Sequence, residues 1–263
     1  MAAAEHDTFL NTFIALATEL ADAAGAVIRP YFRRPLTIDD KPDLSPVTVA
    51  DRAAEQAMRR LIEVRFPDHG IIGEECGRVR EDAELVWVLD PIDGTKSFIS
   101  GVPLFGTLIA LTRGGEPVLG VIDQPISGER WVGSVGRLST LNGAAIRCRQ
   151  CDGLAPATLF ATTPDMFRGP DAAAFGRVAD AAKLVRYGAD CYAYGLLAAG
   201  FVDLVVEASL KPYDFCAIVP IVEGAGGIAT DWRGAKLGLG SDGRVLIAGD
   251  RRAHRAALAL LDE

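Results

Sequence analysis

The chemistry open to this sequence is most visible where an apolar run ends in two acids. Residues 87–98 read Trp-Val-Leu-Asp-Pro-Ile-Asp-Gly-Thr-Lys-Ser-Phe. The proline-forced bend between Asp90 and Asp93 allows both carboxylates and a main-chain carbonyl to converge on one point, the oxygen-rich coordination that Mg²⁺ prefers. Gly94 permits close backbone approach, and the N–H groups after it can open a helix that faces a phosphate. The alternative is a strand-end aspartate followed by an ordinary Asp-Gly turn.

Further acids stand at the ends of predicted elements. Glu74 and Glu75 directly follow an apolar run, and Asp51 lies in a Thr-Val-Ala-Asp sequence. Two glutamates after a strand can simply be solvated, and Asp51 fits a capping box that opens a helix, a role compatible with a place in a site. Asp214 precedes another apolar run, so it can either join a site or act as a helix N-cap.

Histidine and cysteine chemistry is poorly supplied. The five cysteines form no disulfide framework, and there are three histidines. Cys148 and Cys151 form a lone C-x-x-C pair, without the second cysteine pair or neighbouring histidine that a zinc site needs. A thiol-redox module based on this pair is an outside alternative. Any metal is expected to bind oxygen ligands.

Hydrophobic periodicity places the first acids on an α+β half. Apolar residues at three- and four-residue spacing predict a helix over 8–34, ended by Pro35, and a second helix over 49–65, with a polar loop over 39–45 between them. Strands are expected at 70–73 and 85–89, followed by an antiparallel meander of 105–112, 117–123 and 130–133 and by a hairpin at Asn142-Gly143.

After about residue 153 the pattern changes to alternating strands and helices, which is typical of an α/β arrangement. Strands are expected at 159–162, 202–206, 228–230 and 245–248, and helices near 171–182, 190–200, 214–225 and 250–261. The fold class is therefore α/β in the broad sense, an α+β half followed by an α/β half. We expect two subdomains, 1–150 with most candidate metal ligands and 151–263 with Asp214 and the substrate-specificity side, within one compact catalytic unit.

Composition excludes several classes of protein. The 263 residues carry 27 basic and 35 acidic side chains, a net charge of −8 that argues against a nucleic-acid-binding surface. We expect no apolar run of the roughly 18–20 residues needed to span a bilayer, and no signal peptide, because residues 1–26 lack a basic start. A cytoplasmic protein is expected. An anionic substrate would need something other than net charge to attract it.

Taken together, these blocks resemble the inositol monophosphatase family of Mg²⁺-dependent phosphatases. The matching blocks occur in the family's order and span about residues 10–260: Val-Thr-Val-Ala-Asp51, Ile72-Gly-Glu74-Glu75, Asp90-Pro-Ile-Asp93-Gly94-Thr95, and Tyr213-Asp214 with Glu223-Gly-Ala-Gly-Gly. The resemblance implies a layered α/β/α/β/α fold and a homodimer. The combination of blocks is highly specific, whereas each block alone is not.

The resemblance also assigns roles to residues. It implies metal coordination by carboxylates and one carbonyl, from Glu74, Asp90, Asp93, Asp214 and the main chain of Ile92, with Glu75 the less favoured neighbour. Thr95 and Asp51 would position the attacking water and count with Glu74 as catalytic. Main-chain groups of Gly94, Thr95 and Lys96 would bind the phosphate.

Metal chemistry agrees with those roles. A phosphate monoester is doubly negative and the protein is acidic, so two or three Mg²⁺ ions, with Mn²⁺ a conceivable substitute, would neutralise the site. Hydrolysis of such esters requires up to about 10²¹-fold acceleration, which side-chain acid–base catalysis of about 10²–10⁴-fold does not provide. Metal ions would activate the water and stabilise the leaving alkoxide.

The substrate end resembles the histidinol-phosphatase branch of the family. The pattern Gly-x-Asp190-Cys-Tyr192-x-Tyr194, the segment 203–207 ending in Glu207, and Lys-Pro-Tyr-Asp-Phe at 211–215 fit that branch, as does 124–131. Histidinol phosphate carries an ammonium group and an imidazole, so Asp190 and Glu207 would suit its cationic end through charge-assisted hydrogen bonds. Asp190 could instead cap the helix at 190–200, and the tyrosines could pack that helix or stack on an imidazole.

Alternatives remain within and outside this class. An inositol-1-monophosphatase or a broad sugar-phosphate phosphatase differs from a histidinol-phosphatase in sequence only around Asp190. A non-catalytic metal-binding regulatory protein is the remote alternative, but all candidate ligands are retained. The expected partner in every enzymatic case is a small phosphate ester.

Overall fold

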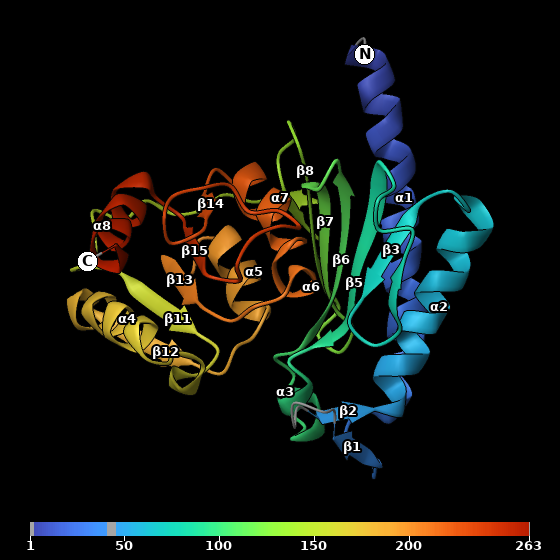
Figure 1. Ribbon diagram of the computed structural model, residues 1–263, viewed down its shortest axis with the longest axis horizontal. Helices are drawn as coiled ribbons and strands as arrows, with labels where there is room; N and C mark the ends of the chain where they lie inside the picture. Colours follow the sequence, from blue (N-terminus) through green and yellow to red (C-terminus); the bar gives the residue numbers. More distant parts are fainter. Residues whose placement is uncertain (1–2, 41–45, 263) are drawn as a thin grey trace.

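The computed structural model describes residues 3–40 and 46–262, which form two β-sheets separated and flanked by helices (Figure 1). An eight-stranded sheet is built from β3–β10, in the order β10-β9-β8-β7-β6-β5-β3-β4, and a five-stranded sheet has the order β12-β11-β13-β15-β14. A small hairpin, β1 (Ile38–Asp40) with β2 (Pro46–Thr48), stands apart from both. The layered α/β/α/β/α arrangement expected from the sequence is confirmed.

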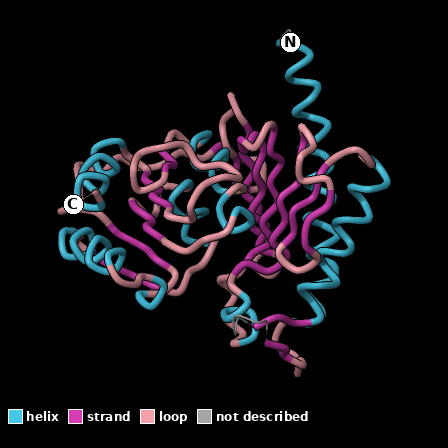
Figure 2. The backbone as a smooth tube through the Cα atoms, in the orientation of Figure 1, coloured by secondary structure: helices cyan, strands magenta, loops and turns pink. Residues whose placement is uncertain are grey.

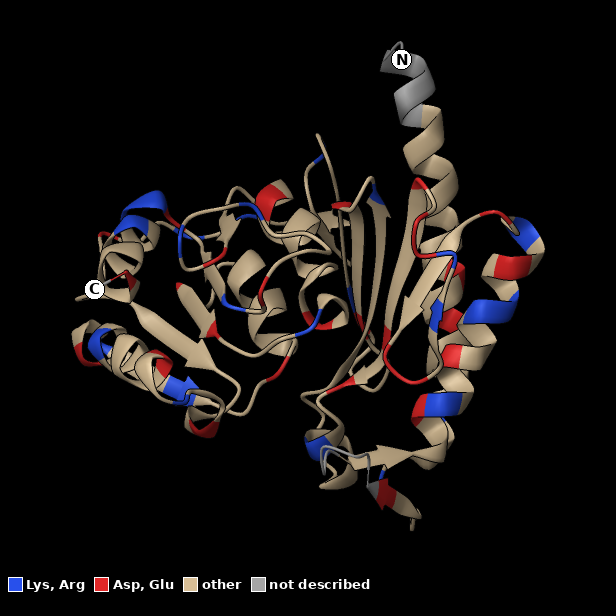
Figure 3. Cartoon of the chain, viewed as in Figure 1, with Lys and Arg blue, Asp and Glu red and all other residues tan. Residues whose placement is uncertain are grey.

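The first layer consists of α1 (Ala3–Ile28) and α2 (Val49–Arg65), which pack together on one face of the larger sheet (Figure 2). Charged residues of both signs are interspersed along α2 (Figure 3). The strands of this sheet are β3 (Gly70–Gly73), β4 (Gly77–Val79), β5 (Leu85–Asp93), β6 (Gly106–Arg113), β7 (Glu116–Gln124), β8 (Glu129–Ser134), β9 (Thr140–Leu141) and β10 (Ala144–Ala145). All neighbouring pairs are antiparallel except β3 with β5.

Strand β5 shows how the sheet separates two cores. Trp87 and Leu89 face the core beneath α1 and α2, whereas Val86 and Val88 face the core on the opposite side. Successive side chains of a strand point to opposite faces, so a strand covered on both faces is apolar throughout. The continuous apolar run before Asp90 therefore reflects burial on both sides.

The middle layer lies between the two sheets and contains α5 (Tyr192–Ala198), α6 (Pro212–Phe215) and α7 (Ile218–Gly224). Beyond it, the smaller sheet comprises β11 (Thr158–Ala161), β12 (Leu184–Tyr187), β13 (Leu204–Glu207), β14 (Ile228–Thr230) and β15 (Val245–Ala248). Its outer face is covered by α4 (Pro170–Ala181) and α8 (Arg251–Leu261). Short helices α3 (Thr95–Ile99), η1 (Arg29–Tyr31) and η2 (Pro164–Met166) complete the chain.

Most predicted elements are present, with informative exceptions. The predicted helix over 8–34 ends at Ile28 and continues only as η1, because Pro30 lacks the N–H that an α-helix needs and restricts the residue before it. The predicted helix over 214–225 is two helices, α6 and α7, and Pro220 lies in the first turn of the second. Of the predicted loop over 39–45, residues 39 and 40 belong to β1, and residues 41–45 lie outside the described residues.

The second half is less regularly α/β than expected. Strands β11, β12 and β13 are parallel, but β15 runs antiparallel to both of its neighbours. Strand β12 was not predicted, because three of its four residues are exposed and it lacks an apolar run. The division into subdomains at about residue 150 stays a prediction.

One helix corrects an expectation about apolar length. The segment Thr8–Tyr31 is 24 residues long and contains an 18-residue window with a mean hydropathy of 1.2, so it is long and apolar enough by composition to cross a membrane. In this structure Phe13, Leu16 and Leu20 of that segment are at most 5% exposed, because they lie in the core between the larger sheet and the helices α1 and α2. A core helix can be as long and as apolar as a membrane span, so this run by itself is weak evidence for a span.

Candidate active site

The candidate site begins at the carboxyl end of β5, where the strand is irregular. Asp90 pairs with Leu108 of β6 and Asp93 pairs with Gly106, so β5 has one residue more than its partner between these pairs. In a regular strand, residues three apart point to opposite faces. The extra residue of the bulge removes that alternation and allows Asp90 and Asp93 to face the same point.

Asp214 approaches the same point from α6. A carboxylate oxygen from each of Asp90, Asp93 and Asp214 lies within 4.8 Å of the other two. Asp214 Oδ2 also accepts a hydrogen bond from the main-chain N–H of Lys211, at 2.7 Å. The N-cap of α6 is Lys211, and Asp214 is the third residue of the helix, so the N-cap alternative for Asp214 is wrong. Residues 124 positions apart in the sequence thus meet in one cluster.

Electrostatics show that this cluster fits a cation. Burial raises the pKa of Asp90 well above its usual range, and the charges of Glu74, Asp93 and Asp214 raise it further. Burial likewise raises the pKa of Asp93, with Asp190 adding to the effect. Burial also raises the pKa of Asp214, to about 7. Carboxylates destabilise one another in this way when nothing positive lies between them, and hard divalent cations bind such oxygen donors.

Glu74 lies beside this cluster, in the turn after β3. Its side chain is in hydrogen-bonding contact with Asp90, and its charge raises the pKa of Asp90, Asp214 and Asp51. Its main-chain N–H donates to the carbonyl of Leu89 at 3.1 Å, so β5 also fixes the start of this turn. Glu74 and Asp90 reach the site from parallel neighbouring strands, β3 and β5.

Asp51 has both features that the sequence indicated. Its Oδ2 accepts hydrogen bonds from the main-chain N–H of Thr48 at 2.9 Å and from the Thr48 hydroxyl at 2.5 Å, which closes the predicted capping box of α2. Its Oδ1 is buried and has no hydrogen-bond partner within residues 3–40 and 46–262. Burial raises the pKa of this carboxyl, and the charge of Glu74 contributes. The orphaned oxygen is a candidate acceptor for water.

The segment after Asp93 turns sharply into α3. Gly94 has φ of +85°, a conformation that favours glycine, and Thr95 is the first residue of α3. The Thr95 hydroxyl donates to the carbonyl of Ile92 at 3.1 Å, and the main-chain N–H of Ile92 donates to Asp90 at 3.0 Å. The side chain of Lys96 is exposed. Burial raises the pKa of Asp190, and the hydrogen bond from Ser97 and the charge of Lys96 only partly offset this rise.

A pocket of about 140 Å³ adjoins the cluster on the side of the smaller sheet. It is lined by nine residues from both halves of the chain: Asp93, Thr162, Met166, Asp190, Cys191, Tyr194, Glu207, Leu210 and Asp214. Among residues 3–40 and 46–262, the lining contains four carboxylates and no lysine, arginine or histidine. Both residues predicted to contact the substrate, Asp190 and Glu207, lie in this pocket.

Asp190 is linked to the predicted phosphate loop. Its Oδ2 accepts a hydrogen bond from the Ser97 hydroxyl at 2.7 Å, and a Cβ on Gly94 would lie 2.9 Å from the same oxygen. The alternative of a helix cap is wrong, because α5 starts at Tyr192 and its N-cap is Cys191. Sequence reasoning missed Ser97, although it lies two residues after Thr95.

Glu207 also lies in the pocket lining, and each of its carboxylate oxygens accepts one hydrogen bond and keeps a further lone pair. Its Oε1 accepts a hydrogen bond from the main-chain N–H of Thr162 at 2.7 Å, and its Oε2 accepts one from the Tyr194 hydroxyl at 2.6 Å. Burial raises its pKa. The Tyr192 hydroxyl instead donates to Glu129 at 2.7 Å, so that tyrosine turns away from the pocket lining. Sequence reasoning did not anticipate the role of Thr162, because a main-chain donor leaves no residue-type signal.

The cysteine pair does not look like a redox centre. Burial raises the pKa of both Cys148 and Cys151 to about 11, so neither thiol is activated as a thiolate. The Cys151 thiol donates to the carbonyl of Gly153 at 3.2 Å. Neither cysteine lines the acidic pocket.

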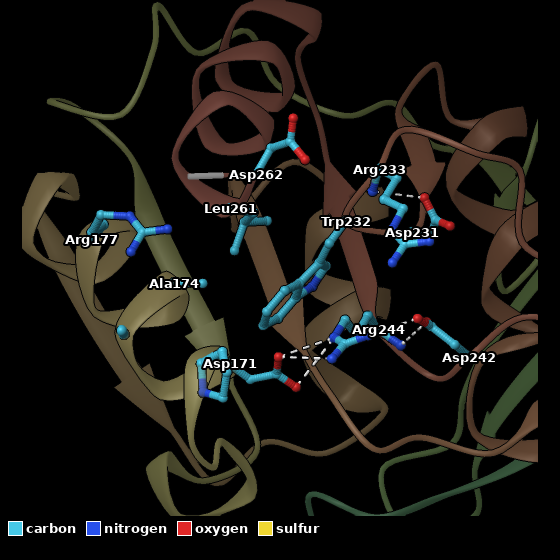
Figure 4. Close-up of a pocket in the computed structure, with 12 residues that line it drawn as sticks. Asp171, Ala174, Arg177, Asp231, Trp232, Arg233, Asp242, Arg244, Leu261 and Asp262 are labelled. Carbon is cyan, nitrogen blue, oxygen red and sulfur yellow. Dashed lines mark hydrogen bonds and ion pairs between the residues drawn. The ribbon is translucent and has the colours of Figure 1, made fainter.

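A larger hollow of about 370 Å³ lies between α4, α8 and the loops around β14 and β15 (Figure 4). Its most prominent cation, Arg244, donates to Asp171 at 3.0 Å and to Asp242 at 2.9 Å, and it lies over the ring of Trp232. Arg244 is therefore already ion-paired with two acids in the wall of the hollow. It contains none of the predicted site residues.

Comparison with known proteins agrees with the geometry. Residues 10–263 match the sequence profile of the inositol monophosphatase family. The chain is 52% identical to the chloroplastic bifunctional phosphatase IMPL2 of Arabidopsis thaliana, over 97% of this chain and 77% of that protein. It is 37% identical to the histidinol-phosphatase of Chlorobaculum parvum, over 94% and 95% of the two chains. It is also similar to a solved inositol monophosphatase from Zymomonas mobilis, with a TM-score of 0.89, 49% identity and 100% coverage of both chains.

The fold and the acidic cluster define a phosphatase of a class that is generally metal-dependent. The chain belongs to the inositol monophosphatase family.

Proposed function

We propose that this phosphatase is a histidinol-phosphatase, which hydrolyses L-histidinol phosphate to L-histidinol and phosphate in histidine biosynthesis. The observation that carries the proposal is the acidic pocket beside the cluster, in which the described lining residues include no cationic side chain. Divalent cations at Asp90, Asp93 and Asp214 would leave Asp190 and Glu207 for the substrate. Their charges suit the ammonium and imidazole of histidinol.

The relatives support this substrate class. One histidinol-phosphatase aligns with nearly the whole chain at 37% identity, and another, from Mycobacterium tuberculosis, does so at 35%. The proposal includes two or three Mg²⁺ ions, with Mn²⁺ as a substitute, a homodimer and a cytoplasmic location. The partner that we propose is a small phosphate ester, and we propose neither a nucleic acid nor a membrane as a partner.

In this mechanism the side chains bind and orient the reactants. Glu74, Asp90, Asp93, Asp214 and the Ile92 carbonyl would hold divalent cations, which would supply Lewis-acid neutralisation of the phosphoryl group and the departing alkoxide.

The remaining groups act directly on water and phosphate. Asp51 Oδ1, which has no partner among the described residues, accepts a hydrogen bond from the attacking water. The Thr95 hydroxyl, which donates to the Ile92 carbonyl, accepts a hydrogen bond from the same water. Main-chain N–H groups of Gly94, Thr95 and Lys96 bind the phosphate.

An inositol-1-monophosphatase or a broad sugar-phosphate phosphatase is the second candidate. The similarity to the Zymomonas mobilis inositol monophosphatase, at 49% identity, favours it. In such an enzyme Glu207 would accept hydrogen bonds from ring hydroxyls, and Asp190 would have no cationic partner.

The deciding experiment measures phosphate release from L-histidinol phosphate and inositol-1-phosphate side by side, with Mg²⁺ and with EDTA. We expect kcat/KM to be at least about 100-fold higher for histidinol phosphate, about 2.7 kcal/mol of transition-state discrimination. Comparable rates, or preference for inositol-1-phosphate, would support the second candidate. A folded protein without Mg²⁺-dependent release from any phosphate ester would favour a non-catalytic regulatory protein.

Asp190→Asn tests the specificity role. The amide keeps an acceptor for Ser97 but loses the charge, so we expect KM for histidinol phosphate to rise about tenfold or more. Turnover of a neutral phosphate ester should change much less. Asp165→Asn, at an exposed acid outside the pocket lining, is the matched control. Equal losses on both esters would contradict a role of Asp190 in recognising a cation.

A further inference from the structure

Helix α2 carries three buried charged residues on one face. Asp51, Glu55 and Arg59 follow one another at four-residue spacing and are 0%, 0% and 8% exposed. Residues four apart share a helix face. Asp51 belongs to the candidate site, but no step described above uses the other two. Buried charges are costly unless they are paired and hydrogen-bonded, so their partners indicate what they do.

Glu55 binds the turn that contains Glu74. Its Oε2 accepts a hydrogen bond from the main-chain N–H of Glu75 at 2.7 Å, and its Oε1 accepts one from the N–H of Cys76 at 3.1 Å. The same Oε1 accepts from Nε of Arg59 at 2.7 Å. One carboxylate therefore satisfies two consecutive main-chain donors and its own ion-pair partner.

Arg59 also binds the main chain of this turn. Its Nη2 donates to the carbonyl of Gly77, where β4 begins. At the other end of the turn, the N–H of Glu74 is already bonded to the carbonyl of Leu89 on β5. Each residue from 74 to 77 thus has a main-chain group bound either to the charged pair of α2 or to β5.

The end of β3 passes directly over this pair. A Cβ at Gly73 would lie 1.9 Å from Oε1 of Glu55 and 2.8 Å from Nη2 of Arg59. No side chain fits at that separation, so glycine is required for the strand to approach the pair. The path of the backbone immediately before Glu74 is therefore set by contact with α2.

We propose that Glu55 and Arg59 are positioning residues that fix the main chain of residues 74–77, so that the Glu74 carboxylate faces Asp90 and is ready to bind a cation. This inference rests on the proposed metal-binding role of Glu74. Stability alone does not explain the pair, because well-packed apolar residues often replace buried ion pairs without loss. What apolar residues cannot replace is the acceptor for two adjacent N–H groups.

Glu55→Gln tests the proposal with little change in volume. The amide offers one acceptor oxygen and a donor group where the carboxylate offers two acceptors, so at least one N–H of the turn loses its partner. We expect Mg²⁺ affinity, measured calorimetrically on the purified protein without substrate, to fall about tenfold, the lower end of the range for residues that orient ligands. The Mg²⁺ concentration for half-maximal activity should rise in parallel, while kcat at saturating Mg²⁺ stays within about twofold of wild type.

Asp203→Asn is the matched control for general damage. Asp203 is also a buried carboxylate, 2% exposed, that accepts from an arginine, Arg149 Nε at 2.6 Å, and from a main-chain N–H, that of Thr158 at 2.7 Å. It lies beside the smaller sheet and contributes to neither the cluster nor the pocket. We expect this variant to lose thermal stability and to keep wild-type Mg²⁺ affinity.

Arg59→Lys provides a second variant if Glu55→Gln does not fold. A lysine keeps the charge but lacks the planar fork that reaches both Glu55 and the Gly77 carbonyl, so Mg²⁺ affinity should again fall. Wild-type Mg²⁺ affinity in either folded variant overturns the proposal. Wild-type protein that neither binds Mg²⁺ nor releases phosphate would instead overturn the proposed function, so the two failures are distinguishable.

Discussion

At the scale of residues, the site consists of buried carboxylates whose charged forms are destabilised by burial and by one another. Asp90, Asp93 and Asp214 share one point, and the pKa of each is raised first by burial and then by neighbouring acids, which include Glu74, Asp190 and Glu207. Such strain persists only when the surrounding structure fixes it, and a bound cation relieves it. The bulge in β5 and the short helix α6 provide that constraint.

Asp93→Asn should abolish activity while leaving the fold intact. The amide nearly preserves shape and can still accept from the N–H of Cys191, which lies 2.6 Å from Oδ2 in the wild type. It removes a charge that would bind metal, so we expect kcat/KM to fall by at least about 100-fold. Asp82→Asn, at an exposed acid before β5, is the control. Substantial Mg²⁺-dependent turnover in a folded Asp93→Asn protein would contradict the site assignment.

Protons and metal ions should compete at the cluster. The pKa of Asp214 is about 7 in the folded protein against a usual 3.8. Protonated Asp214 therefore contributes to the free energy of unfolding fully below about pH 3.8, and this contribution is lost as pH rises through about 7. A cation must displace the proton at lower pH. We therefore expect the Mg²⁺-induced rise in Tm to be larger at about pH 8 than at about pH 6.

Asp214→Asn should reduce this pH dependence, since the amide does not titrate. Differential scanning calorimetry at both pH values, with Mg²⁺ and with EDTA, measures the effect. An Mg²⁺-induced shift that is equal at both pH values would rule out this competition.

At the scale of elements, the middle helices pack closely enough on the larger sheet to restrict side chains. A Cβ at Gly120 of β7 would lie 1.8 Å from the carbonyl oxygen of Ala217, just before α7. At Gly133 of β8, a Cβ would lie 2.4 Å from the Cα of Ile221. This close approach brings α6, and with it Asp214, near the end of β5.

Gly120→Ala should therefore destabilise the protein by about 1–3 kcal/mol, because α7 must move away from β7. Gly176 of α4 is the control, since a Cβ there meets nothing within 4 Å, and Gly176→Ala should stabilise by about 0.5–1 kcal/mol. Urea unfolding of both variants gives these values. Similar stabilities for the two alanine variants would show that the sheet and helix adjust at little cost.

At the scale of the whole molecule, the two sheets contribute different parts of the site. Asp90, Asp93 and Glu74 come from the larger sheet and the turn after β3, whereas Glu207 comes from β13 of the smaller one. The middle layer supplies Asp214 and shares one hydrophobic core with facing residues of both sheets. Hydrophobic packing of the layers therefore sets the distance between the cluster and the acidic pocket.

The smaller sheet should contribute an acid-sensitive part of stability. Asp203 accepts from Arg149 and Thr158, which together hold its pKa below the usual 3.8 despite burial. A lowered pKa in an acid gives stability that is present above the usual value and is lost as pH falls through the folded value. The stability difference between wild type and Asp203→Asn should therefore shrink when urea unfolding is moved from pH 7 to pH 3, and a constant difference would contradict it.

Sequence alone determined the features that depend on local order. Periodicity gave α2 with its observed bounds, 49–65, and the meander of β6, β7 and β8, because a helix stripe and an alternating hairpin are properties of neighbouring residues. The Asp-Pro-Ile-Asp block identified Asp90 and Asp93 as site candidates, and the capping box of Asp51 was visible as a motif. Breaks at Pro30 and before Pro220 were overlooked, although both are local signals.

Only the tertiary structure decided which distant groups meet. Spacing alone left Asp214 open, and only the family resemblance placed it with Asp90, 124 residues away. That Asp190 pairs with Ser97 and that Glu55 holds the turn of Glu74 are contacts across 93 and about 20 residues that nothing in the sequence indicated. Main-chain donors leave no residue-type signal, and the packing of layers that unites them depends on the summed burial of three cores. Neither is encoded in any short stretch of sequence.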